Sequence, residues 1–118
     1  MKDEPRAKAL TDLARKRYIT INELQEPYRQ VEEYYEIICE IILAFMCKSG
    51  VEISNNKTLI AFAKENIKVL TSPEISLIED LRIKRNNIVS SGEIVSSEFL
   101  RTRKSAIDWM IEKMLKTN

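Results

Sequence analysis

The segment 81–88 carries the residues best suited to chemistry, because it places Arg82, Lys84 and Arg85 next to Asn86. A guanidinium offers a fork of N–H donors that matches a phosphate group, and an ammonium adds a compact positive charge. The asparagine amide can orient a neighbouring group or help to cap the helix end. These residue types are suited to binding an anion from a helix.

Arg85 is the unusual member of this segment. At about 100° per residue on a helical wheel, it falls within an apolar stripe. The stripe consists of Ile78, Leu81 and Ile88. A guanidinium is costly to bury unless it is paired. Either Arg85 pairs with a carboxylate of a neighbouring helix, such as Glu36 or Glu40, or it opens into a groove with Asn86 and binds an anion.

Several kinds of chemistry are excluded by composition. The chain has no histidine, so the usual general base and the commonest metal ligand are missing. Its only glycines are Gly50 and Gly92, which rules out a glycine-rich phosphate loop. The carboxylates at positions 32, 36 and 40 follow helical spacing but lack the Glu-x-x-His pairs of a di-metal bundle. We therefore expect a solvated acidic stripe, with neither metal nor cofactor.

Helical periodicity predicts the elements that position these residues. The expected helices cover 4–18, a long segment that ends at Ser49, 57–70, 73–89 and 98–116. The first should bury Ala7, Leu10, Leu13, Ala14 and Arg17. Thr20 and Glu23 form a capping-box pattern for the long helix, and Pro27 either kinks that helix or moves its start to about Glu26. Residues 54–56 form a polar break, and Ser96 or Ser97 caps the last helix.

These elements predict an all-α fold, an antiparallel four- to five-helix bundle formed by one domain over residues 1–118.

The longest apolar run, 37–47, is interrupted by Glu40 and is too short to span a bilayer. Cys39 and Cys47 lie about 12 Å apart on one helix, beyond disulfide range, and we expect buried free thiols. No signal-peptide pattern is evident, so we expect a cytoplasmic protein that does not bind membranes.

The residues Leu81-Arg82-x-x-Arg85-Asn86-x-Ile88-x-Ser90-Ser91-Gly92 resemble the signature of HEPN domains. These are small helical bundles of prokaryotic toxin–antitoxin and nucleotidyltransferase-associated proteins. The order of helices along the chain is also similar. The resemblance implies an HEPN-like bundle that forms a homodimer. It aligns Arg85 with the arginine of the family, Asn86 with the adjoining polar residue and Ser90 with the position of the family's histidine.

Active HEPN domains cleave RNA without a metal, using that arginine and histidine at a dimer interface. Serine at position 90 cannot replace histidine as an acid–base group near neutral pH. We therefore expect a non-catalytic homodimer that binds nucleic acid, such as RNA, or nucleotide phosphates through Arg82, Lys84, Arg85, Asn86 and Ser90. Two alternatives stay open: a protein-interaction subunit that partners a minimal nucleotidyltransferase in a toxin–antitoxin-like pair, and a residual ribonuclease.

Overall fold

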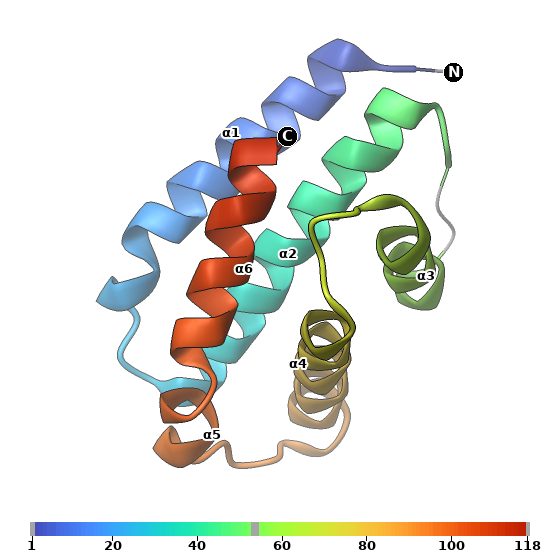
Figure 1. Cartoon of the computed structure of the whole chain (residues 1–118). Helices are drawn as coiled ribbons and strands as arrows, with labels where there is room; N and C mark the ends of the chain where they lie inside the picture. The colour runs from blue at the N-terminus through green and yellow to red at the C-terminus, as the bar shows by residue number, and fades with distance from the viewer. Residues whose placement is uncertain (1, 53–54, 118) are drawn as a thin grey trace.

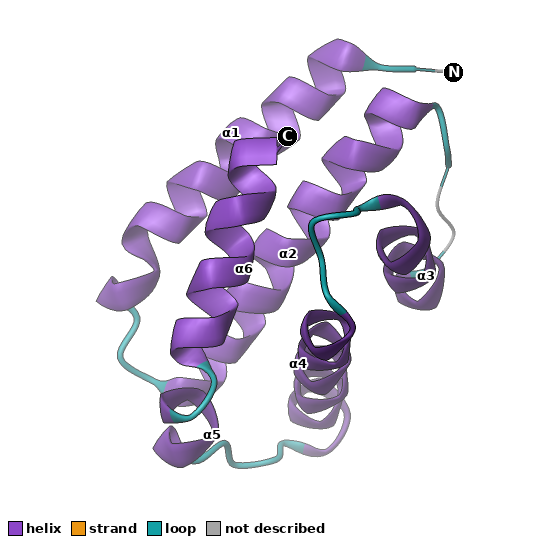
Figure 2. Cartoon of the chain, in the orientation of Figure 1, coloured by secondary structure: helices purple, strands orange, loops and turns teal. Residues whose placement is uncertain are grey.

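The computed structural model describes residues 2–52 and 55–117, and within these ranges it contains helices and turns but no strand (Figures 1 and 2). In chain order the elements are α1 (Glu4–Thr20), the 3₁₀ turn η1 (Ile21–Glu23), α2 (Pro27–Ser49), α3 (Asn56–Asn66), α4 (Ser72–Ser91), α5 (Ser97–Arg101) and α6 (Lys104–Thr117). The all-α fold expected from the periodicity is confirmed.

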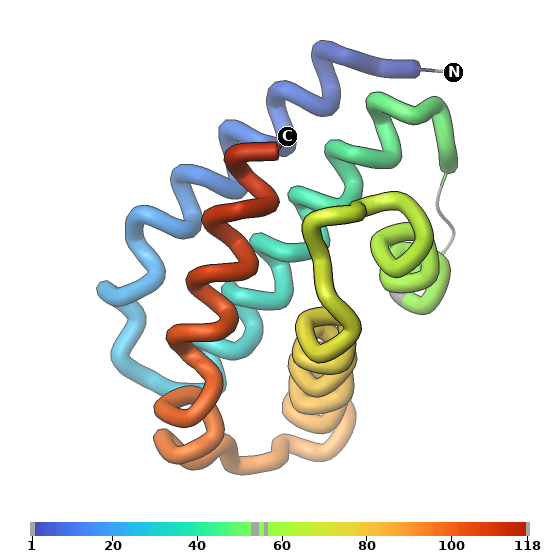
Figure 3. The backbone as a smooth tube through the Cα atoms, viewed as in Figure 1, coloured from blue at the N-terminus to red at the C-terminus, as the bar shows by residue number. Residues whose placement is uncertain are grey.

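The long helix α2 is the centre of the bundle. Ile37, Ile38 and Ile41 on this helix have no exposed surface, and α2 packs most extensively against α1 and α4. The chain returns at its end to lay α6 beside α1, as the tube in Figure 3 shows. A helix that is apolar on most sides must be covered by neighbours, and this explains the central place of α2.

Strong local signals mark the start of α4 and the ends of α2 and α4. Thr71 and Glu74 form a reciprocal capping box at the start of α4. Gly50 ends α2 and Gly92 ends α4, with φ angles of 74° and 66°. A left-handed residue is strained unless it is glycine, so these two positions stop their helices sharply.

The expected capping box at Thr20 and Glu23 is wrong. The Thr20 hydroxyl donates back to the carbonyls of Lys16 and Arg17, as a residue inside a helix does. α2 begins at Pro27, the second of the two alternatives for this proline, because proline suits the first turn of a helix. The intervening residues form η1 and an extended link.

Three other boundaries differ from expectation. α3 ends at Asn66 rather than Leu70, because Ile67 adopts an extended conformation. α4 continues through Ser90 and Ser91, whose hydroxyls donate to carbonyls four residues back. The last helix is divided into α5 and α6 at Thr102, whose hydroxyl and N–H both bond to the end of α5. The expected polar break at 54–56 lies partly outside the described residues.

Two burial predictions need correction. Leu13 is 40% exposed, and Thr11 takes its place among the buried residues of α1. Cys47 is buried as expected, whereas Cys39 is only half-buried, and both are free thiols. Within the described ranges no helix combines the length and apolar character that a membrane crossing requires.

Candidate functional site

Arg85 lies on α4 one turn beyond Leu81, beside the outer surface of α2. Its side chain is half-buried, and the guanidinium carbon lies 5.8 Å from the centre of the Tyr35 ring on α2. A cation over an aromatic face at this distance is attracted to it. Within the described part of the chain, Arg85 forms no hydrogen bond or ion pair through its side chain, so its N–H donors are available to a ligand or partner.

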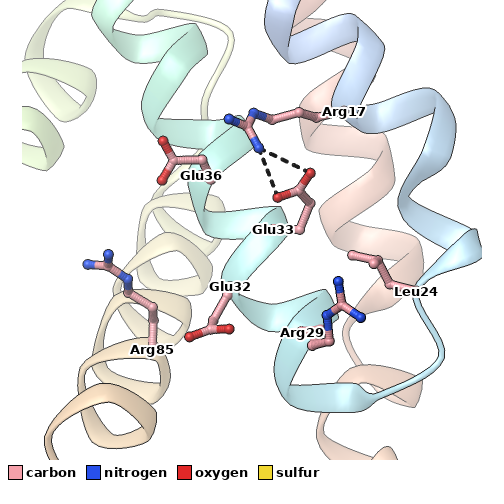
Figure 4. Close-up of a pocket in the computed structure, with 7 residues that line it drawn as sticks. All are labelled: Arg17, Leu24, Arg29, Glu32, Glu33, Glu36 and Arg85. Atoms are coloured by element: carbon pink, nitrogen blue, oxygen red, sulfur yellow. Dashed lines mark hydrogen bonds and ion pairs between the residues drawn. The ribbon is translucent and has the colours of Figure 1, made fainter.

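A charged groove of about 400 Å³ surrounds the Arg85 guanidinium. Its lining consists of Arg17, Leu24, Arg29, Glu32, Glu33, Glu36 and Arg85. Figure 4 shows that the α2 residues form its floor, while Arg17 on α1 and Arg85 on α4 stand on opposite walls. Arg17 is already paired with Glu33 at 3.2 Å. The groove therefore presents a balanced set of cations and carboxylates rather than a positive pocket.

Glu32 and Glu36 are the carboxylates of this groove that lack an ion-pair partner among the described residues. They lie one turn apart on α2, and Glu36 is exposed. Of the two alternatives for Arg85, an ion pair with Glu36 or Glu40 is not found among the described residues. A negative group that approached Arg85 would also approach these two carboxylates, so the groove fits a partner that carries both charges better than a free phosphate.

Arg82 and Lys84 point to their own partners instead of joining Arg85. The Nε and Nη2 atoms of Arg82 donate to Glu79 at 3.0 and 3.1 Å, and this bidentate contact raises the pKa of Arg82. The Lys84 ammonium donates to Glu93 at 2.6 Å. The run of basic residues in the sequence is therefore divided, in space, into two internal ion pairs and one unpaired guanidinium.

Asn86 and Ser90 lie on the exposed side of α4, and neither lines the charged groove. The Ser90 hydroxyl donates to the Asn86 carbonyl at 2.7 Å, which is a local helix contact. Of the five residues that the sequence nominated for phosphate binding, Arg85 alone lines the charged groove.

Glu40 is the site-related residue that pattern reasoning missed. The sequence places it in a solvated stripe or opposite Arg85, but it is only 4% exposed and accepts instead from Arg17 Nε at 2.9 Å. Burial raises the pKa of the Glu40 carboxyl, and the attraction of Arg17 offsets only part of this. One Glu40 oxygen has no hydrogen-bond partner among the described residues. In the sequence, the burial of Glu40 is indicated by its position between Cys39 and Ile41, inside the longest apolar run.

A separate apolar groove lies along the first turn of α2. It has a volume of about 400 Å³ and is lined by Glu26, Pro27, Tyr28, Ile88, Gly92, Glu93, Ile94 and Val95. Ile94 is 93% exposed and Tyr28 is 43% exposed. Because Tyr28 precedes Glu32 by one helical turn, the two grooves lie next to each other along α2. We call the strip of Tyr28, Glu32, Glu36, Arg85 and Ile88 the α2–α4 surface.

Comparisons of the chain with protein-family models, curated proteins and solved structures found no match. Among the described residues, no group of three or more Cys, Asp or Glu side chains is arranged to hold a metal ion. The fold and the site together define an all-α protein whose α2–α4 surface has an apolar end and a charge-balanced end.

Proposed function

We propose that the chain is a non-catalytic, HEPN-like binding module that forms a homodimer through the α2–α4 surface. The observation that carries the proposal is the unpaired Arg85 guanidinium beside two unpaired carboxylates, Glu32 and Glu36, in one groove. Each of these charges lacks an ion-pair partner among the described residues of its own chain, and a second copy would bring the opposite charges.

The arrangement of α2 and α4 allows Arg85 of each copy to pair with Glu32 and Glu36 of the other under two-fold symmetry. The start of α2 lies beside the end of α4, because Pro27 and Tyr28 share the lining of one groove with Ile88. A two-fold axis that runs along the seam between the two helices places α2 of each copy against α4 of the other at the same level. Arg85 then faces Glu32 and Glu36 of the second copy, and each contact occurs twice.

The apolar end of the surface also matches itself under this axis. Tyr28 on α2 meets Ile88 of the second copy, and the exposed Ile94 lies at the same end. Tyrosine and arginine are the residue types that most often carry binding energy at protein interfaces. Burial of this end supplies an area-dependent attraction, and the charged end favours one relative orientation.

The composition of the chain supports a binding role rather than ribonuclease activity. No histidine is present, and the residue at the position of the family's histidine is Ser90. A serine hydroxyl does not exchange protons near neutral pH without an adjacent base. Residual ribonuclease activity stays a prediction, and incubation of the protein with mixed RNA tests it. Arg85→Ala is the control, because any cleavage that depends on this site must disappear in the variant.

Binding of RNA or nucleotide phosphates also stays a prediction, one that the carboxylates beside Arg85 make less favourable. Its test is RNA binding at low salt, which should weaken steeply as salt rises. Equal RNA affinity of the wild type and Arg85→Ala would exclude a role for this site. The alternative of a minimal nucleotidyltransferase as partner is tested by co-purification with the product of a neighbouring gene.

Sedimentation equilibrium tests the homodimer. We expect the wild type to dimerise and Arg85→Glu to dissociate at least about 30-fold more readily, since losing a close interfacial charge pair costs about 2 kcal/mol or more. Lys16→Glu is the matched control, because Lys16 is exposed on α1 and its substitution changes the net charge equally. A monomeric wild type, or equal effects of both variants, would overturn the homodimer.

A further inference from the structure

A third groove lies between α1 and α6, on elements that the α2–α4 surface does not use. It has a volume of about 350 Å³ and is lined by Arg15, Tyr18, Ile19, Glu112, Leu115 and Lys116. The two helices are joined here by hydrogen bonds from Tyr18 Oη to Glu112 at 2.7 Å and from Arg15 Nη2 to the Leu115 carbonyl at 3.0 Å. The walls of the groove are therefore fixed relative to each other.

Large apolar side chains are exposed at and near this groove. Ile19 is 79% exposed at its edge, and Trp109 is 65% exposed one turn before Glu112 on the same side of α6. Isolated exposed apolar residues are ordinary, but an exposed isoleucine on an apolar groove, with a tryptophan nearby, is typical of a protein-binding surface.

The charges at the edge of the groove indicate the character of the partner. Arg15 on α1 and Lys116 on α6 are exposed and form no ion pair with any described residue. Lys16 on α1 is a third exposed cation close to the groove. The one carboxylate of the lining, Glu112, already accepts a hydrogen bond from Tyr18. Around the apolar centre the three cations Arg15, Lys16 and Lys116 therefore outnumber this one carboxylate, and the net charge is positive.

We infer that the α1–α6 groove binds an acidic amphipathic helix of a partner protein. One apolar side chain of that helix packs between Ile19 and Leu115, and its flanking carboxylates approach Arg15 and Lys116. Laying the apolar face of a helix into a groove between two helices is a common mode of peptide recognition. This inference is independent of the homodimer, because the two surfaces share no residue.

A designed peptide tests the inference with the full chain. The probe is a helical peptide without tryptophan, with leucines at i, i+3, i+4 and i+7 and glutamates elsewhere; a matched peptide carries lysines in place of the glutamates. Trp109 is the single tryptophan of the chain, so its fluorescence reports binding. We expect a saturable change with the acidic peptide and at least about tenfold weaker binding of the basic one.

Variants locate the binding site. Ile19→Asp should weaken binding of the acidic peptide by about tenfold or more, because it puts a carboxylate into the apolar contact. Ile83→Asp makes the same change at an exposed position of α4 and should leave binding unchanged. Arg15→Glu combined with Lys116→Glu should reverse the peptide preference. Absence of binding, equal binding of both peptides, or equal effects of Ile19→Asp and Ile83→Asp would overturn the inference.

Discussion

Replacement of Arg17 by methionine should be among the most destabilising single changes on α1. Arg17 joins α1 to α2 through Glu40 at 2.9 Å and Glu33 at 3.2 Å. Methionine keeps much of the apolar stem but leaves the buried Glu40 carboxylate without a counter-charge.

The expected loss can be estimated from burial. Removing one partner of a fully buried pair costs about 3–5 kcal/mol. The Arg17 side chain is 33% exposed, so solvent screens part of this interaction and we expect about 2–3 kcal/mol. For a chain of 118 residues, this corresponds to a fall in Tm of about 8–12 °C. Urea unfolding followed by circular dichroism measures the free energy of unfolding directly.

The effect should depend on pH in a defined direction. The pKa of Glu40 is raised above its ordinary value of 4.5 in the folded protein, and without Arg17 it rises further. A raised pKa means that the folded state binds a proton on Glu40 more tightly than the unfolded state does. Protonation of Glu40 therefore stabilises the fold at a pH below the pKa of the unfolded state, and this stabilisation is lost as pH rises through the pKa of the folded state. The cost of Arg17→Met should therefore be smaller at about pH 5 than at about pH 7.5.

A second substitution separates this cause from a general packing defect. In the Arg17→Met background, Glu40→Gln removes the buried charge and should restore at least about 1 kcal/mol. The reasoning is refuted if the double variant is no more stable than Arg17→Met, or if the cost of Arg17→Met is the same at both pH values.

Four further predictions concern the two ends of α4 and the Cys39 thiol. Gly92→Ala should cost about 1 kcal/mol in urea unfolding through backbone strain alone, because φ is 66° and no atom lies within 4 Å of the added Cβ. Thr71→Ala should cost about 1 kcal/mol in urea unfolding, because the α4 cap is lost. Although burial opposes the shift, hydrogen bonds from Lys113 and Thr71 lower the pKa of Glu74. The stability of the wild type should therefore fall as pH drops below about 4.5, and Glu74→Gln should reduce that fall. Burial raises the pKa of Cys39 to about 11, so alkylation by iodoacetamide at about pH 8 should be slow until urea unfolds the chain, and rapid labelling of the native protein would contradict this.

The sequence predicts a helix boundary well where neighbouring residues alone determine it. The left-handed Gly50 acts within one turn of the chain, so the end of the long helix at Ser49 is predicted correctly. The start predicted at residue 73 lies one residue from Ser72, where Thr71 and Glu74 form a local capping box. The pattern at Thr20 and Glu23 has the same form but fails, because α1 continues through Thr20 and its hydroxyl is used within α1. A capping pattern predicts a helix start only if the preceding helix has already ended.

The candidate site was predictable only in part, because ion pairing depends on residues that are distant in sequence. The helical wheel predicts that Arg85 lies within an apolar stripe, and in the structure its guanidinium lies over the Tyr35 ring of α2. The sequence did not predict that Glu93 would fold back onto Lys84, nor that Arg17 from α1 would pair with Glu40. Both pairings require the tertiary arrangement.

A charge-swap experiment tests the homodimer most directly. Arg85→Glu alone should fail to dimerise, because its new carboxylate faces Glu32 and Glu36 of the second copy. A chain with both Glu32→Arg and Glu36→Arg should also fail, because its new guanidinium groups face Arg85. When the two variants are mixed, opposite charges meet at both contacts of the two-fold interface, so a heterodimer should form.

Native mass spectrometry of the mixture is therefore the decisive measurement, since the two variants differ in mass. The proposal predicts a heterodimer about as tight as the wild-type dimer, while each variant alone remains monomeric at the same concentration. A mixture that stays monomeric although both variants keep their helical content, or an Arg85→Glu variant that dimerises like the wild type, would contradict the proposed interface.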